Sequence, residues 1–219
     1  MFKKGFTITE VLIALGIVGI VSAAAIPQLH NNVLKTNAGT VLGKTVQQIE
    51  TSCANMLRID SEQNGDYNEL LGLMNNPSFE IDNLSTYFSA TISDNNNAVT
   101  TYSGDNYAGL NNSSRFDFSK YPASFSIEIL ELNDNNTNNA NANIANIYID
   151  INGFDNAPNN LGRDIFYFHL TNGGRMIPHG IETFNVLTQN NPDRCWNNVV
   201  GTGEGCAARV VADGFKINY

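Results

Sequence analysis

Residues 1–30 read MFKKGFTITEVLIALGIVGIVSAAAIPQLH. From Phe6 to Ile26 the only charged side chain is Glu10. The run has about the 20 residues that an α-helix needs to cross a bilayer. A carboxylate inside such a run costs about 2.5–3.5 kcal/mol at mid-membrane and marks a functional residue by default. The stretch therefore predicts a membrane-spanning helix that carries a functional acid.

A cleaved secretory signal peptide is the competing interpretation of this stretch. The small residues at 22–25 imitate a cleavage site, and Lys3 and Lys4 would precede the apolar core of either kind of segment. An acid within the apolar run is not typical of a signal peptide, however. The apolar pattern also continues past Pro27 with helical spacing, whereas a signal peptide has no reason to continue into a structural helix.

Beyond Pro27, apolar and small residues recur at three- and four-residue steps, namely Leu34, Ala38, Val41, Leu42, Thr45, Ile49, Cys53, Met56 and Leu57. This spacing predicts an amphipathic helix over residues 28–60, with a kink at Pro27. The glycines of the two helical segments are 16, 19, 39 and 43. They indicate close helix packing and local unwinding, or are simply tolerated.

Residues 3–15, KKGFTITEVLIAL, resemble the N-terminus of type IV pilins and of type II secretion pseudopilins. The resemblance implies that prepilin peptidase cuts after Gly5 and methylates the new amine of Phe6. It also implies that Glu10 faces the N-terminal amine of a neighbouring subunit and that Pro27 is the proline common in this helix. The close likeness covers residues 1–35, and the rest resembles the family only in architecture.

The expected fold is α+β, with a long N-terminal helix, half membrane-spanning and half amphipathic, packed on a β-rich globular head with an antiparallel sheet. The expected parts are a leader, a transmembrane and assembly helix, an amphipathic helix and the head, at residues 1–5, 6–27, 28–60 and 61–219. The expected strands are residues 124–132, 144–151, 165–170 and 209–217. A helix is predicted at 67–74, a helix or strand at 84–92, and an Asn-rich insertion at 133–143.

Three cysteines are present, at positions 53, 195 and 206, without the spacing of a zinc site. Cys195 and Cys206 bracket a glycine-containing loop, WNNVVGTGEG, that would let the two sulfurs meet. We expect a disulfide between them in an oxidising compartment and two buried thiols in a reducing one. Cys53 is expected to pack as a small apolar residue.

Oxygen-bearing side chains gather in the segment 150–164 around a glycine turn. Asp150, Asn152, Asp155 and Asp164 could hold Ca²⁺, because this hard cation takes oxygen ligands from such loops. The segment lacks the bidentate glutamate of an EF-hand loop and lies between two predicted strands. A hydrogen-bonded turn is therefore the alternative.

Nucleic-acid binding is not expected, because the formal charge is −9 and no Lys/Arg cluster is present. Catalysis is not expected either. His169 and His179 accompany neither a G-x-S-x-G nor an HExxH pattern. The sequence thus predicts a protein that is not an enzyme and that has no cofactor other than possible Ca²⁺.

The resemblance implies a structural filament subunit, stored as a single-pass inner-membrane protein with its head in the periplasm. It would then enter a secretion pseudopilus or a cell-surface pilus. Its partners would be prepilin peptidase, other pilin or pseudopilin subunits and the inner-membrane assembly platform. One alternative is a minor pilin-type binding module for adhesion, DNA uptake or secreted substrates, and DNA would be a partner only in that case. The other alternative is a membrane-anchored enzyme or receptor.

Overall fold

The computed structural model describes residues 7–64, 70, 83–94, 97–110, 113–130, 139–181, 195, 201–217 and 219. The chain divides into two compact units, Met1–Asn37 and Ala38–Tyr219. The helix from Ala38 onward thus belongs to the same compact unit as the head, which was expected to begin at residue 61.

A single long helix, α1 (Ile8–Asn64), opens the described chain and includes Pro27. It confirms the predicted N-terminal helix. In the first unit the described large apolar side chains of this helix are exposed to between 46% and 81%, and they are Ile8, Val11, Leu12, Ile13, Leu15, Ile17, Val18, Ile20, Val21, Val33 and Leu34. A helix that is apolar on every side requires cover from lipid or from other helices.

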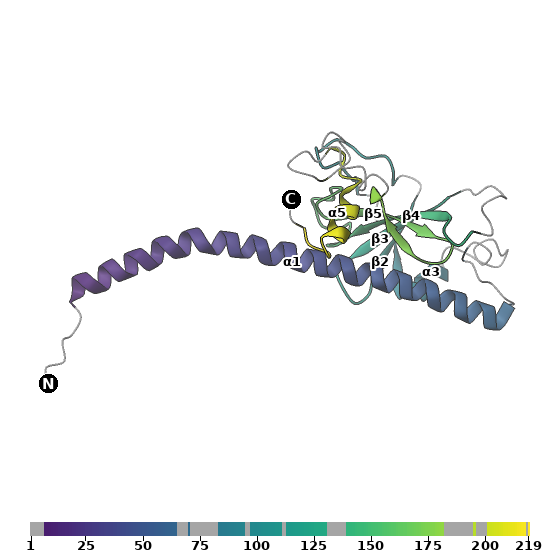
Figure 1. The fold of residues 1–219 in the computed structure, drawn as a ribbon, viewed down its shortest axis with the longest axis horizontal. Helices are drawn as coiled ribbons and strands as arrows, with labels where there is room; N and C mark the ends of the chain where they lie inside the picture. The colour runs from purple at the N-terminus through teal and green to yellow at the C-terminus, as the bar shows by residue number, and fades with distance from the viewer. Residues whose placement is uncertain are drawn as a thin grey trace. The chain divides into compact units, whose positions relative to one another are not determined.

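The second unit is built on one antiparallel sheet whose strands follow each other in chain order, β1-β2-β3-β4-β5-β6 (Figure 1). The strands are β1 (Ala90–Ser93), β2 (Ser114–Phe118), β3 (Ser124–Ile129), β4 (Asn143–Asp150), β5 (Ile165–Thr171) and β6 (Met176–Pro178). Two short helices accompany them, α3 (Asn83–Phe88) and α5 (Cys206–Ala212). The α+β class with an antiparallel sheet is confirmed.

Alternation along the strands gives the sheet two different faces. One face packs against the second half of α1 and against α3 and α5 around a single core, which includes Leu42, Ile49, Phe88, Phe125, Ile147, Phe166 and Val210. The backbone N–H of Met176 also donates to Glu50 Oε1 at 2.9 Å, which ties β6 to α1. The other face holds a smaller cluster in which Tyr148 and Tyr167 pack with Val99 and Leu110.

Three of the predicted strands are confirmed, as β3, β4 and β5. The segment predicted as helix or strand at 84–92 contains both, since α3 ends at Phe88 and β1 begins at Ala90. The short strands β2 and β6 were not predicted. Of the helix expected at 67–74 only Leu70 is described, and residues 133–138 of the Asn-rich insertion lie outside the described residues.

The strand predicted at residues 209–217 is wrong. Residues 206–212 form α5 instead, and the chain then turns at Gly214, whose φ is +69°. The β-branched pair Val210 and Val211 favours a strand locally. The helix prevails because it buries Cys206, Ala207 and Val210 in the core on one helical face.

Candidate functional site

The first turn of α1 carries the predicted assembly residue, Glu10. Its Oε2 accepts hydrogen bonds at 2.8 Å from both the backbone N–H and the hydroxyl of Thr7, and the N–H of Glu10 donates to Thr7 Oγ1 at 3.3 Å. These reciprocal bonds form a capping box, in which a Thr and a Glu three residues later satisfy the free donors of the helix start. The pattern Thr-x-x-Glu could have revealed this in the sequence, but it was missed.

Three other residues near the N-terminus were expected to act in processing or in assembly. Gly5 and Phe6 lie outside the described residues, and Pro27 lies within α1. Among the residues that the structure describes, no helix is both long enough and apolar enough to cross a membrane.

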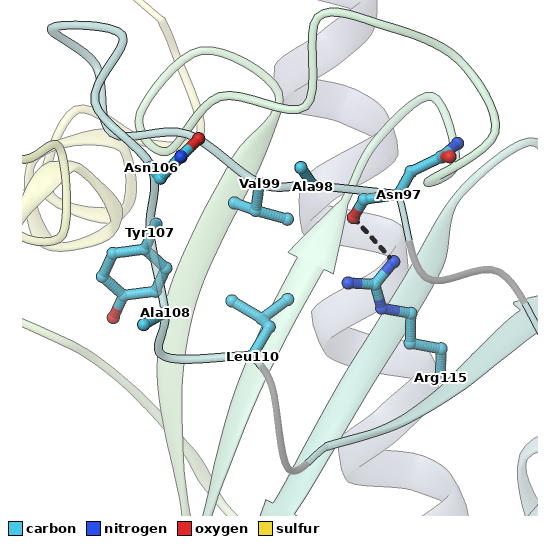
Figure 2. Close-up of a pocket in the computed structure, with 8 residues that line it drawn as sticks. All are labelled: Asn97, Ala98, Val99, Asn106, Tyr107, Ala108, Leu110 and Arg115. Carbon is cyan, nitrogen blue, oxygen red and sulfur yellow. Dashed lines mark hydrogen bonds between the residues drawn. The ribbon is translucent and has the colours of Figure 1, made fainter.

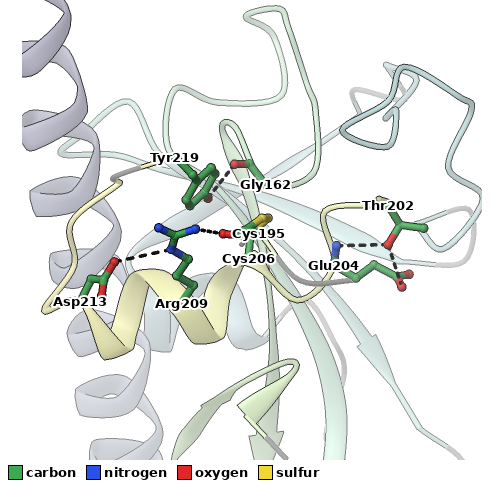
Figure 3. The surroundings of a disulfide bond; sticks show 8 residues. All are labelled: Gly162, Cys195, Thr202, Glu204, Cys206, Arg209, Asp213 and Tyr219. Atoms are coloured by element: carbon green, nitrogen blue, oxygen red, sulfur yellow. Dashed lines mark hydrogen bonds and ion pairs between the residues drawn. A yellow bond between two sulfur atoms is a disulfide. The ribbon is translucent and has the colours of Figure 1, made fainter. Parts of the chain in front are cut away.

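In the head, the structure joins Cys195 and Cys206 in a disulfide at the start of α5 (Figure 3). Both cysteines are at most 1% exposed, and the Sγ of Cys206 lies against Gly162 in the loop between β4 and β5. The disulfide therefore fastens Cys195 to the start of α5, which lies beside that loop. Cys53 is a buried free thiol in α1.

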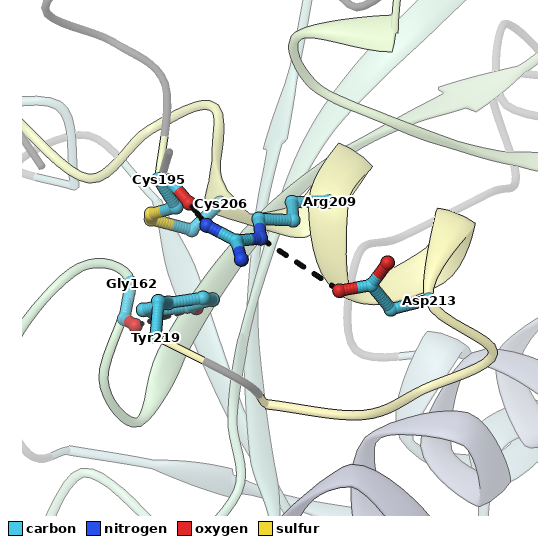
Figure 4. A network of polar contacts seen from close by, with 6 residues as sticks. All are labelled: Gly162, Cys195, Cys206, Arg209, Asp213 and Tyr219. Atoms are coloured by element: carbon cyan, nitrogen blue, oxygen red, sulfur yellow. Dashed lines mark hydrogen bonds and ion pairs between the residues drawn. A yellow bond between two sulfur atoms is a disulfide. The ribbon is translucent and has the colours of Figure 1, made fainter. Parts of the chain in front are cut away.

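A polar network extends from this disulfide to the C-terminus (Figure 4). Arg209 donates through Nη1 to the carbonyl of Cys195, forms an ion pair with Asp213 at 3.7 Å, and places its guanidinium 5.3 Å from the ring centre of Tyr219. The hydroxyl of Tyr219 donates to the Gly162 carbonyl at 2.7 Å. Arg209 thus connects the disulfide, α5 and the last residue of the chain.

The C-terminal segment also contacts α1, through two of the four glycines singled out in the sequence. A Cβ atom at Gly39 would overlap the carbonyl oxygen of Phe215, and one at Gly43 would lie 3.2 Å from the Phe215 ring. A Cβ atom added at Gly16 or Gly19 would meet no other atom within 4 Å. Gly39 and Gly43 therefore allow a contact within the chain, which was not among the expectations of close helix packing, local unwinding or simple tolerance.

The proposed calcium ligands lie in or beside the loop between β4 and β5. Asp150 Oδ1 accepts the N–H groups of Asn152 and Gly153, and the two oxygens of Asp164 accept those of residues 159 and 160. Asp155 is exposed. The backbone thus uses several of the oxygens that a cation would need, although Asp150 Oδ2 and Asn152 Oδ1 are buried without a hydrogen bond.

Two observations bear on metal binding and charge in this loop. Within the described ranges, no group of three or more His, Cys, Asp or Glu side chains is placed to hold a metal ion. Burial, together with the nearby carboxylate of Asp164, raises the pKa of Asp150 to about 8. Calcium binding at this loop stays a prediction, and its measurement can be combined with a pH titration.

We expect the head to lose stability as pH rises from about 5 to 8. Asp150 keeps its proton in the folded state up to a pKa of about 8, whereas in the unfolded chain it loses the proton near pH 4. The unfolded state then binds fewer protons, which lowers the free energy of unfolding by about 1.4 kcal/mol and the Tm by roughly 3–6 °C per pH unit. Thermal unfolding in EDTA should show this slope in the wild type and a flatter one in Asp150→Asn.

The same Tm measurement is then repeated with added calcium. If Ca²⁺ binds between Asp150 and Asp164, millimolar calcium at pH 8 raises the Tm of the wild type and leaves that of Asp150→Asn unchanged. An equal response of the two proteins to calcium would contradict a site at this loop. A wild-type Tm that is flat between pH 5 and 8 would contradict the raised pKa.

The two histidines that were judged non-catalytic in the sequence lie together. His169 Nε2 and His179 Nδ1 are 2.9 Å apart, and His169 Nδ1 lies 3.2 Å from Asn146 Oδ1. Because a carboxamide oxygen only accepts, His169 Nδ1 carries the hydrogen and its Nε2 accepts from His179. Burial and the neighbouring His179 lower the pKa of His169 to about 4. The arrangement is a hydrogen-bonded pair of histidines in which His169 is neutral at pH 7, and the sequence did not reveal it.

Comparison with known proteins gives one match. Residues 1–26 match the family model described as the prokaryotic N-terminal methylation motif, which is the signature of type IV pilins and pseudopilins. No curated protein and no solved structure gives a significant match to the chain. The motif supports a precursor of the type IV pilin-like or pseudopilin kind, a structural class that is generally non-enzymatic. It implies processing by prepilin peptidase and assembly with other pilins.

Proposed function

We propose that this protein is a filament subunit of a type IV pilus or of a type II secretion pseudopilus. Prepilin peptidase cuts the precursor between Gly5 and Phe6 and methylates the amine of Phe6. The observation that carries the proposal is the methylation motif at residues 1–26. Within the same segment, the apolar run from Phe6 to Ile26 and its single acid, Glu10, also support the proposal.

Before assembly, the apolar helix is held in the inner membrane with the head in the periplasm. This part of the proposal is supported by the sequence, in which Glu10 is the only charged residue from Phe6 to Ile26. The exposed apolar side chains of the first unit support it too, because water is an unfavourable surrounding for them. In the filament, helices of neighbouring subunits replace the lipid around this segment.

Glu10 directs the register of assembly. Cleavage leaves a positive amine at Phe6, and two opposite charges about 4 Å apart attract by about 4 kcal/mol at an effective dielectric constant near 20. In the single chain the Glu10 carboxylate is already hydrogen-bonded by Thr7. The capping box therefore partly offsets the cost of the acid until the amine of a neighbouring subunit becomes its partner.

The proposal is tested on the mature N-terminus and on filament yield together. Mass spectrometry of the wild-type protein should find Phe6 as a methylated first residue. Glu10→Ala and Glu10→Gln should be processed in the same way, because the cut bond is unchanged. Both should form filaments in yields lower by on the order of tenfold or more, since the charge pair is lost.

Glu10→Gln is the matched control, because glutamine can still complete the capping box and lacks only the charge. Normal yield from Glu10→Gln together with low yield from Glu10→Ala would assign Glu10 to helix capping and remove the charge pair. An intact Met1, or a mature chain that begins after Ala25, would refute the proposed function as a whole. The abundance of the protein in sheared filaments separates a major subunit from a minor one.

A further inference from the structure

A pocket of about 310 Å³ opens beside the loop that precedes β2. Figure 2 shows the guanidinium of Arg115 near one end and the ring of Tyr107 near the other, with the side chains of Val99 and Leu110 between them. Val99 and Leu110 are at most 4% exposed. The remaining lining residues are Asn97, Ala98, Asn106 and Ala108. The pocket thus combines an apolar floor, carboxamides and one cation.

Arg115 is held in a defined position at this end. Its Nη1 donates to the carbonyl of Asn97 at 3.1 Å, and its guanidinium carbon lies 4.6 Å from the ring centre of Phe154. The residue is only 8% exposed. A guanidinium fixed in this way recognises a carboxylate without a large loss of side-chain entropy.

Two carboxyl groups act on the polar ends of the pocket. Asp150 stabilises the charged form of Arg115. At the other end, the hydroxyl of Tyr107 donates to Glu204 Oε1 at 2.7 Å and stays neutral, because burial raises its pKa. The Arg115 end is therefore the part of the pocket that suits an anion.

We propose that this pocket binds a small organic monocarboxylate with an apolar body about the size of one ring. Its carboxylate lies on Arg115, and its apolar body lies over Val99 and Leu110. The volume is at the lower end of the roughly 300–1,000 Å³ of small-molecule pockets, which limits the ligand to this size. The inference assigns a ligand class to the head and does not depend on filament assembly.

Benzoate is the probe, and benzamide is its neutral counterpart of nearly the same shape. Titration of the full chain in detergent, followed by calorimetry at pH 6.5, should give saturable benzoate binding. Benzamide should bind on the order of tenfold more weakly, because it lacks the charge that Arg115 recognises. Equal affinities for the two probes, or no saturable benzoate binding, would overturn the proposal.

A matched pair of variants tests the place of binding. Ala108→Trp fills the pocket from an exposed position, and Ala54→Trp adds the same side chain at an exposed position on α1. Benzoate binding should be lost in Ala108→Trp and kept in Ala54→Trp, with both variants showing the circular dichroism of the wild type. Binding that persists in Ala108→Trp would refute this pocket as the site.

Discussion

Replacing Gly39 with alanine should lower the Tm of the head by about 4–8 °C. The new Cβ would overlap the carbonyl oxygen of Phe215, which is backbone and cannot move aside by changing a rotamer. Overpacking of this kind costs about 1–3 kcal/mol and occasionally more. The helix propensity of alanine returns only about 1 kcal/mol. Thermal unfolding of the full chain, followed by circular dichroism, measures the shift, at about 2–4 °C per kcal/mol for a unit of this size.

The chain offers graded controls for this substitution. The new Cβ of Gly16→Ala would meet no other atom within 4 Å, so this substitution should leave the Tm of the head unchanged. Gly43→Ala meets ring atoms of Phe215 from 3.2 Å, so a small shift of that ring should limit its effect to less than that of Gly39→Ala. Hydrogen exchange should show faster exchange around Phe215 in Gly39→Ala only. Equal Tm values for Gly16→Ala and Gly39→Ala would show that the C-terminal segment does not depend on the Gly39 contact.

Removing the disulfide should have an effect of similar size. In the chain-entropy model, closing a loop with a sequence separation of 11 stabilises the folded state by about 3 kcal/mol. The double variant Cys195→Ser, Cys206→Ser should therefore melt about 6–12 °C below the wild type. The loss includes the fixed position of the Cys195 carbonyl, which accepts a hydrogen bond from Arg209.

Reduction of the wild-type protein provides the internal control for the disulfide. A reducing agent should lower the wild-type Tm to that of the double variant and should not change the variant. Cys53 is present in both proteins, so a response that comes from this thiol would appear in both. If reduction leaves the wild-type Tm unchanged, the bond does not contribute to the stability of the folded head.

Much of the sheet could be predicted because its signal is local. The strands β3, β4 and β5 alternate or run apolar over 6–8 residues, and turn residues such as Asn152 and Gly153 separate them. For α5 the local signal was misleading. Its two valines favour a strand, and only burial of one helical face in the core decides for the helix.

The histidine pair, the Arg115 pocket and the Gly39 contact could not be predicted, because their partners come together only through the fold. His169 and His179 meet only because β5 pairs with β6, and Arg115 reaches Asn97 only after β2 has its place in the sheet. Likewise, nothing near Gly39 in the sequence indicates that Phe215 will pack there. A pattern along the chain carries no information about such contacts.

The sequence by itself determined the methylation motif and the start of helix α1. The methylation motif is contiguous, and the helix start depends on two residues only three positions apart, Thr7 and Glu10. Tertiary structure alone decided the fastening of the C-terminus to α1 and the position of Arg115 in its pocket. The physical reason is range, because a helix turn forms between near neighbours, whereas burial and charge in the head depend on which strands the fold places side by side.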